Sequence, residues 1–206
     1  PTALAMVERC GGLTGKEFLT AIAVGEDLAT RLHFATVSRG FDPSGICTVF
    51  RTTAVAGRIL GLDEEQMRNA LGIAFNLAAG SFQSNIDGAL VVRVIQGLSS
   101  RAGIQSAIWA QKGITGVRDI FGGKFGFFQL FSDGQTKIDA LTRDLGKRFE
   151  GAASVAFKLY PGCRCLNAPT WATLQLSEEH NILPQQVKEI LVGLTPFCYE
   201  LTGHPL

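Results

Sequence analysis

The sequence predicts a mainly α-helical domain over residues 1–150, followed by the beginning of an α/β (α+β) domain over residues 151–206. Apolar residues recur at helical spacings through the first two-thirds of the chain, whereas strand-like apolar runs follow Gly151. A strand–helix–strand unit cannot bury both faces of a sheet by itself. We therefore expect a helical body joined to an incomplete second domain.

The first long helix is predicted over residues 15–38, because Phe18, Ile22 and Leu32 stand at helical spacings. The segment "RGFDPSG", residues 39–45, contains two glycines and a proline and predicts a loop. The chain is then expected to return to helix.

Residues 44–61 predict a helix of small side chains, which packs closely against its neighbours. The following helix is expected to begin at Asp63, because Gln66 follows three residues later as in a capping box. Gly80 is expected to end this helix.

Residues 89–113 predict a long helix that is apolar nearly all round and therefore central and buried. Residues 115–131 have short helical potential followed by a Gly/Phe-rich connection, and residues 136–149 predict a last amphipathic helix.

After Gly151, residues 153–161 and 187–201 predict strands, and residues 167–181 predict a helix between them. The expectation of an α/β domain rests on this order of strand, helix and strand.

The composition excludes several classes of protein. A net charge of +1 and a charged fraction of 18% lack the basic face of a nucleic-acid binder. No apolar run is long enough to span a membrane, and no signal peptide opens the chain. The five cysteines are odd in number and unevenly spaced, which indicates reduced thiols in a cytoplasmic protein.

The stretch "FKLYPGCRC" gathers Lys158, Tyr160, Cys163, Arg164 and Cys165 around a Pro-Gly turn. The residues alone leave four interpretations open: a metal site, a redox pair, an anion-binding turn that carries a catalytic lysine, or a strand end.

No metal is expected, because structural zinc sites use C-x₂₋₄-C pairs and this C-x-C has no second pair. Cys198, His180 and His204 lie far downstream. Neither a phosphate loop nor a dinucleotide fingerprint matches the chain.

Four segments, taken in order, resemble the MmgE/PrpD family of 2-methylcitrate dehydratases, cis-aconitate decarboxylases and iminodisuccinate epimerases. They are residues 21–32, 40–80, 97–116 and 157–165. The resemblance covers most of the chain. It implies a helical body, an α/β lid domain, a homodimer, and no required metal or organic cofactor.

The resemblance also implies that the chain is an internal fragment. The family's Asp- and His-containing segment is expected before Pro1, and the rest of the lid after Leu206. We therefore expect the fragment itself to be inactive.

The implied activity of the full-length parent is that of a cofactor-independent lyase or isomerase acting on a small di- or tricarboxylate such as 2-methylcitrate. Removal of a proton beside a carboxylate requires a base and cationic groups that stabilise the enolate-like charge. The departures from the family described below keep open an alternative, a non-catalytic homologue that retains the fold for dimerisation or ligand binding.

Lys158 matches the family's lysine at the start of the lid, where it would pair with a substrate carboxylate or move a proton. The alternative is a strand-end lysine with its charge in water. Arg164 is a candidate for a bidentate carboxylate pair, or else a surface arginine. Tyr160 is a weaker candidate for substrate binding, because strand tyrosines usually pack.

The turn "SNIDG", residues 84–88, borders the site in the family, so Ser84 and Asp87 are candidate substrate contacts. An ordinary connecting loop explains them equally simply.

Three positions depart from the family pattern. Asp42, a candidate catalytic group, stands where many members have His, and it would repel a carboxylate unless protonated or neutralised by a neighbour such as Arg39. Val92 replaces a common lysine. The adjacent Arg93 is a candidate substrate-binding residue, although it points about 100° away on a helix. Asn167 stands where a His is common.

Overall fold

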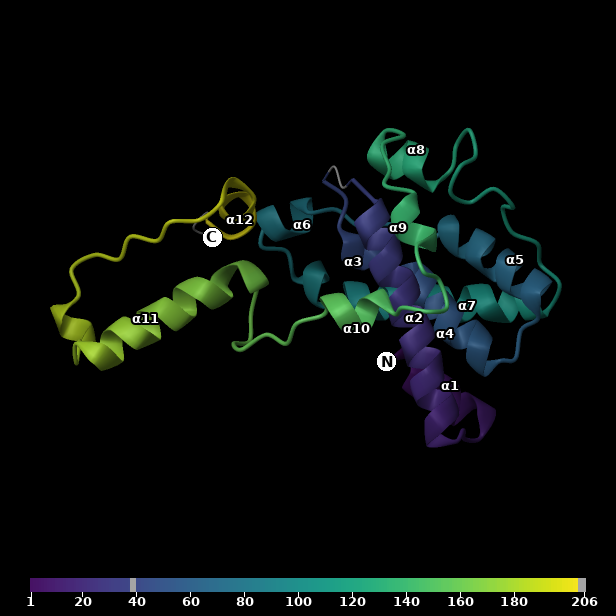
Figure 1. Ribbon diagram of the computed structural model, residues 1–206, viewed down its shortest axis with the longest axis horizontal. Helices are drawn as coiled ribbons and strands as arrows, with labels where there is room; N and C mark the ends of the chain where they lie inside the picture. The colour runs from purple at the N-terminus through teal and green to yellow at the C-terminus, as the bar shows by residue number, and fades with distance from the viewer. Residues whose placement is uncertain (38–39, 204–206) are drawn as a thin grey trace. The chain divides into compact units, whose positions relative to one another are not determined.

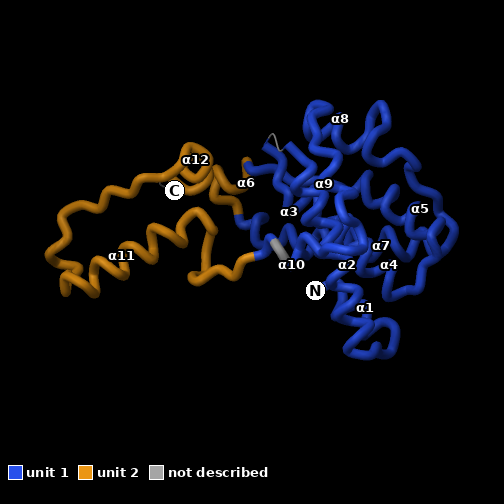
Figure 2. The backbone as a smooth tube through the Cα atoms, viewed as in Figure 1, with its two compact units in different colours: residues 1–82, 90–155 blue, residues 83–89, 156–206 orange. Residues whose placement is uncertain are grey.

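The computed structural model describes residues 1–37 and 40–203, and of Ala153 the backbone alone. The chain divides into two compact units (Figure 2). Unit 1 comprises Pro1–Phe82 and Leu90–Val155, and unit 2 comprises Gln83–Ala89 and the chain from Ala156 onward.

Unit 1 is built from helices, as the sequence predicted (Figure 1). They are α1 (Thr2–Cys10), α2 (Gly15–Ala35), α3 (Pro43–Ile46), α4 (Thr48–Ile59), α5 (Glu64–Phe75), η1 (Leu90–Arg93), α7 (Ile95–Gln111), α8 (Phe127–Ser132), α9 (Asp139–Thr142) and α10 (Glu150–Ser154). In the described part of the chain, β-pairing is limited to two isolated bridges, Thr36 with Thr136 and Phe41 with Ser81.

The predicted capping box at the start of α5 is confirmed. Asp63 Oδ1 accepts a hydrogen bond from Gln66 N at 2.8 Å, and Gln66 Oε1 accepts one from Asp63 N at 3.1 Å. The predicted end at Gly80 is wrong, because α5 ends at Phe75. Asn76 N donates instead to Ile73 O at 3.0 Å, which tightens the last turn and stops the helix.

The helix predicted over residues 89–113 is interrupted: η1 covers Leu90–Arg93, and α7 begins at Ile95. The buried face of α7 consists of small residues that pack on α4 and α5, namely Ser99, Ser100, Gly103, Ser106, Ala107 and Ala110. A Cβ on Gly103 would lie 2.6 Å from Thr53 N, so α4 approaches closely. The prediction that this helix is buried all round is wrong, because Leu98 on the opposite face of α7 is 44% exposed.

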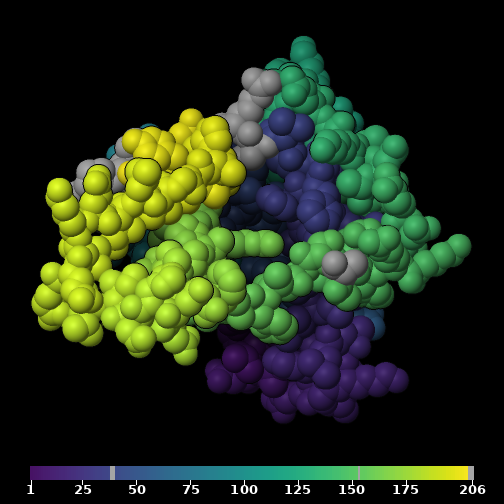
Figure 3. Space-filling model, turned by 60° about the vertical axis from the view of Figure 1, so that its left-hand side comes forward, coloured from purple at the N-terminus to yellow at the C-terminus, as the bar shows by residue number. Residues whose placement is uncertain are grey.

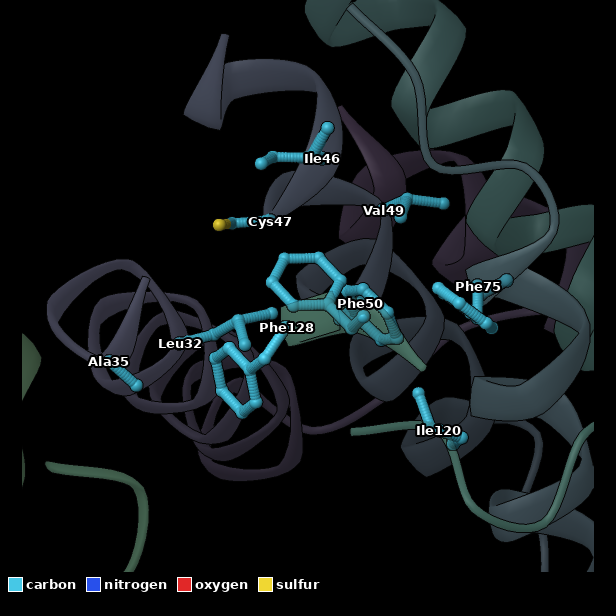
Figure 4. Close-up of a cluster of buried hydrophobic side chains, with 11 residues drawn as sticks. Leu32, Ala35, Ile46, Cys47, Val49, Phe50, Phe75, Ile120 and Phe128 are labelled. Carbon is cyan, nitrogen blue, oxygen red and sulfur yellow. The ribbon is translucent and has the colours of Figure 1, made fainter. Parts of the chain in front are cut away.

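The main core of unit 1 gathers apolar side chains from distant parts of the sequence (Figure 4). Leu32 comes from α2, Phe50 from α4, Phe75 from α5 and Phe128 from α8. The rings of Phe50 and Phe127 meet edge to face, with centroids 5.6 Å apart, a favourable aromatic geometry.

A buried ionic network holds residues 141–150 against α2. Arg31 Nε donates to Asp27 Oδ2 at 2.7 Å, and its two amino groups donate to the carbonyl oxygens of Arg143 at 2.7 Å and Arg148 at 2.6 Å. Asp27 Oδ1 accepts from Glu150 N at 2.6 Å. Both charges are thereby neutralised and hydrogen-bonded, as buried charges require.

The amphipathic helix predicted over residues 136–149 is wrong, because only Asp139–Thr142 is helical. Asp144 and Gly146 have positive φ values of 49° and 79°, which interrupt a right-handed helix. The carbonyl groups of this segment bond to Arg31 rather than to the amides of a helix.

Unit 2 contains short helices: α6 (Gln83–Ile86), η2 (Arg164–Leu166), α11 (Asn167–Glu179), η3 (Pro184–Gln186) and α12 (Pro196–Thr202). The helix predicted over residues 167–181 is confirmed as α11. Helix α12 packs against both α6 and η2.

The strands predicted over residues 153–161 and 187–201 are wrong, since neither described segment forms one. A strand needs a neighbouring strand to satisfy its backbone, and the described residues of unit 2 supply none. Thr195 Oγ1 accepts from Cys198 N at 3.3 Å and begins α12 inside the second segment. The assignment of residues 151–206 to the start of a lid stays a prediction.

None of the described residues of unit 2 is buried. Phe157 is 97% exposed and Leu191 is 93% exposed. In the space-filling view, α11 and the segment that leads to α12 lie at the surface (Figure 3). The order of unit 2 therefore rests on local hydrogen bonds and partial packing.

Candidate functional site

The predicted lysine lies on a tight turn of unit 2. Lys158 Nζ donates a hydrogen bond to Gly162 O at 2.7 Å, and the side chain is exposed. Gly162 has φ 145°, a backbone conformation that side-chain-bearing residues rarely adopt. The ammonium group is thus folded back across the turn rather than extended into solvent.

Asn167 fixes the backbone of this turn. Its Oδ1 accepts from Leu159 N at 3.1 Å and from Tyr160 N at 3.3 Å, and its Nδ2 donates to Cys163 O at 3.2 Å. An amide can do this because it carries both an acceptor and donors. The sequence showed Asn167 only as a departure from the family. The tendency of Asn to bond to nearby backbone was the signal for its structural role.

The two cations of the turn have no acidic partner within the part of the chain that the structure describes. Arg164 begins η2 and is exposed, and Tyr160 is half-buried. Among the described residues, neither Lys158 nor Arg164 forms an ion pair. The turn therefore presents two positive charges that can meet an anion.

The structure places Ser84 and Asp87 in and beside α6, in the same unit as the turn. Asp87 is exposed and its Oδ1 accepts from Gln83 Nε2 at 2.7 Å, while Ser84 O accepts from Ala89 N at 2.9 Å. Helix α12 contacts both α6 and η2. Contact of Ser84 or Asp87 with a substrate stays a prediction.

Asp42 belongs to unit 1, where it caps the short helix α3. Its side chain is 5% exposed, and Oδ1 accepts from Ser44 N at 2.8 Å. Arg39, the expected neutralising neighbour, lies outside the described residues. The capping bond gives Asp42 a structural function, and its catalytic role stays a prediction.

The thiol of Cys47 lies near this carboxylate. Burial raises the pKa of Cys47 to about 12, and the negative charge of Asp42 adds to the rise, while a hydrogen bond with Thr36 opposes it. Cys47 is consequently an unreactive thiol.

Arg93 also belongs to unit 1. It ends η1, is exposed, and forms no ion pair with any described residue. The adjacent Val92 is half-buried. Substrate binding by Arg93 stays a prediction, and the candidate residues form two groups, one in each unit.

The described residues contain no group of three or more His, Cys, Asp or Glu side chains arranged to hold a metal ion. His180 follows the last turn of α11, and His204 lies outside the described residues. None of the described helices combines the length and hydropathy needed to span a bilayer.

Unit 1 is a mainly helical domain, and a turn that carries two cations follows it in the chain. The sequence model of the MmgE/PrpD N-terminal domain matches residues 1–139. The chain belongs to the MmgE/PrpD family, as its ordered segments predicted.

Two curated relatives carry names that describe an activity. Cis-aconitate decarboxylase-like protein oryM of Aspergillus oryzae is 28% identical over 159 residues, which cover 72% of this chain and 33% of the relative. Cis-aconitate decarboxylase of Aspergillus terreus is 24% identical over 186 residues, which cover 85% of this chain and 38% of the relative. The chain thus spans little more than a third of the length of these relatives.

Proposed function

We propose that the complete product of the gene that encodes this chain is a lyase that acts on a small di- or tricarboxylate. Membership of the MmgE/PrpD family and the names of the two fungal relatives support this proposal. The observation that carries it is that Lys158 and Arg164 form no ion pair with any described residue and lie on a turn fixed by Asn167.

The chemistry of the turn suits a reaction that builds negative charge. An ammonium group has three donors, and Lys158 uses one of them on Gly162 O, which leaves two for a carboxylate. The planar guanidinium of Arg164 can grip a second carboxylate with two parallel hydrogen bonds. Loss of carbon dioxide or water beside a carboxylate passes through an enolate-like state, which such fixed cations stabilise.

The finer features of the proposal follow the family resemblance. The protein is a cytoplasmic homodimer that needs no cofactor, and Tyr160, Ser84, Asp87 and Arg93 contribute to substrate binding. Decarboxylation of cis-aconitate, dehydration of 2-methylcitrate and isomerisation of a related acid are all compatible with this set of residues.

A second candidate function has one observation in its favour. Asp42 is buried as the cap of α3, at a position where many family members have a titratable His. A homologue that uses this position for structure rather than for proton transfer would retain the fold for dimerisation or ligand binding.

The test is to incubate the complete gene product with cis-aconitate, 2-methylcitrate, citrate and iminodisuccinate, and to follow each acid by NMR. We expect one of them to be consumed. Lys158→Ala should lower kcat/KM at least about 100-fold, the typical loss for a group that stabilises developing charge. Lys188→Ala removes another exposed lysine of unit 2 and should leave kcat/KM unchanged.

Consumption of none of the four acids would favour the non-catalytic homologue. Full activity in Lys158→Ala would show that this lysine lies outside the site. The 206 residues alone should give no turnover, because they span little more than a third of the length of the relatives, and measurable turnover would contradict this.

A further inference from the structure

Three of the cysteines meet in unit 2. Cys163 and Cys165 flank Arg164, and Cys198 lies on α12, which packs against η2. Cys165 lies in η2, so the packing of η2 against α12 brings its thiol near that of Cys198, and Cys163 lies two residues before it. The sequence had shown a C-x-C pair without a partner, and the fold provides one from more than thirty residues away.

The two thiols of the Cys165–Cys198 pair have pKa values shifted in opposite directions. The interaction with Cys198 is the largest cause that raises the pKa of Cys165 to about 12. The pKa of Cys198 is lowered, first by a hydrogen bond with the Thr195 side chain and then by the one with Cys165. Cys165 is therefore the proton donor of the pair, and Cys198 is the sulfur that more readily carries the negative charge.

We propose that Cys198 and Cys165 form a thiol–disulfide exchange site, which a low-molecular-weight disulfide such as oxidised glutathione converts into an internal disulfide. The two elements that carry these cysteines, η2 and α12, pack together, and both residues are partly exposed, so a small disulfide can reach them. Cys163 is also partly exposed beside Cys165, and the disulfide map described below distinguishes the two possible partners. Cys47 is buried, and Cys10 lies exposed on α1 in unit 1.

The exchange occurs in two balanced steps. The Cys198 thiolate attacks one sulfur of oxidised glutathione, forms a mixed disulfide and releases glutathione thiolate, which takes up the proton that Cys198 lost. Cys165 then loses its proton and attacks Sγ of Cys198, so that the Cys165–Cys198 bond forms and a second glutathione leaves with that proton. Two protein thiols are oxidised, and one small disulfide is reduced to two thiols.

The disulfide would join η2 covalently to α12. Its half in η2, Cys165, comes one residue after Arg164 and two residues before Asn167. If the turn binds substrate, which rests on the proposed function, oxidation would alter how Arg164 is presented. The exchange itself requires no enzymatic activity, so it can be tested independently.

The experiment incubates the chain with oxidised glutathione, titrates the remaining thiols and maps the disulfides by mass spectrometry of peptides prepared without reductant. We expect the thiols to fall by two from the original five, with Cys165 and Cys198 in one cross-linked peptide pair. Dithiothreitol should restore all five.

Three variants sharpen the result. Cys165→Ser should stop the reaction at a glutathione adduct on Cys198, Cys198→Ser should abolish the cross-link, and Cys10→Ser should behave like the parent chain. Circular dichroism checks that each variant retains its helices. A parent chain that forms a Cys163–Cys165 bond, carries glutathione mainly on Cys10, or stops at a stable adduct on Cys198 overturns the proposal.

Discussion

In unit 1 the side chain of Phe50 is fully buried in the main core, whereas in unit 2 Phe157 is 97% exposed. The side-chain hydrogen bonds differ in the same way. Those of Arg31 reach carbonyl groups as far as 117 residues away, while those of Asn167 span at most eight residues. Unit 1 is therefore held by its own tertiary structure, and unit 2 is held mainly by local interactions.

The test with the largest expected effect removes a phenylalanine ring from each unit. Phe50→Ala should lower the free energy of unfolding by about 4 kcal/mol, because it leaves a cavity in a closed core. Phe157→Ala should change it by less than about 0.5 kcal/mol, because the ring is already in water. Urea denaturation followed by circular dichroism measures both, and similar losses would show that the units do not differ.

A second test concerns the buried network of unit 1. Arg31→Ala should lower the free energy of unfolding by about 3 kcal/mol, because it leaves Asp27 buried without its cation. The matched control is Arg68→Ala, which removes an exposed i,i+4 partner of Glu64 at 3.4 Å and should lower it by about 0.3–0.5 kcal/mol. Thermal and urea denaturation measure both variants. Equal losses in Arg31→Ala and Arg68→Ala would mean that the Arg31 network adds no more stability than an exposed ion pair.

The test with the smallest expected effect compares one helix N-cap in each unit. Asp63→Ala should lower the free energy of unfolding by about 1 kcal/mol, the usual value of an N-cap. Thr195→Ala removes the cap of α12 and should leave the main unfolding transition unchanged, because no described residue of unit 2 is buried and could unfold with α12. A shift of that transition in Thr195→Ala would indicate that the two units unfold together.

The sequence predicted the features of the fold that depend on neighbouring residues. The capping box of Asp63 and Gln66 is local, and so is the helix that became α11. The amphipathic pattern of residues 136–149 is local too, but there the carbonyl groups bond to Arg31, more than a hundred residues earlier. A pattern within a segment carries no signal of such a distant competitor.

The same limit applied to the candidate site. Lys158 and Arg164 could be selected because a family resemblance pointed to their stretch, and neither cation pairs with an acidic residue among those the structure describes. The role of Asn167 and the meeting of Cys165 with Cys198 depend on how the chain folds back on itself. The two strands were predicted from apolar runs within their own segments, although a strand exists only where a second strand pairs with it.

The Arg31 network also sets an order of events during synthesis. Asp27 and Arg31 leave the ribosome almost together and can pair within α2 at once. The carbonyl group of Arg148 follows 117 residues later, which at typical rates of translation takes about 6–23 s. For that interval the nascent helix carries a guanidinium whose final acceptors do not yet exist. Unit 1 can complete its fold only when the ribosome has released Glu150.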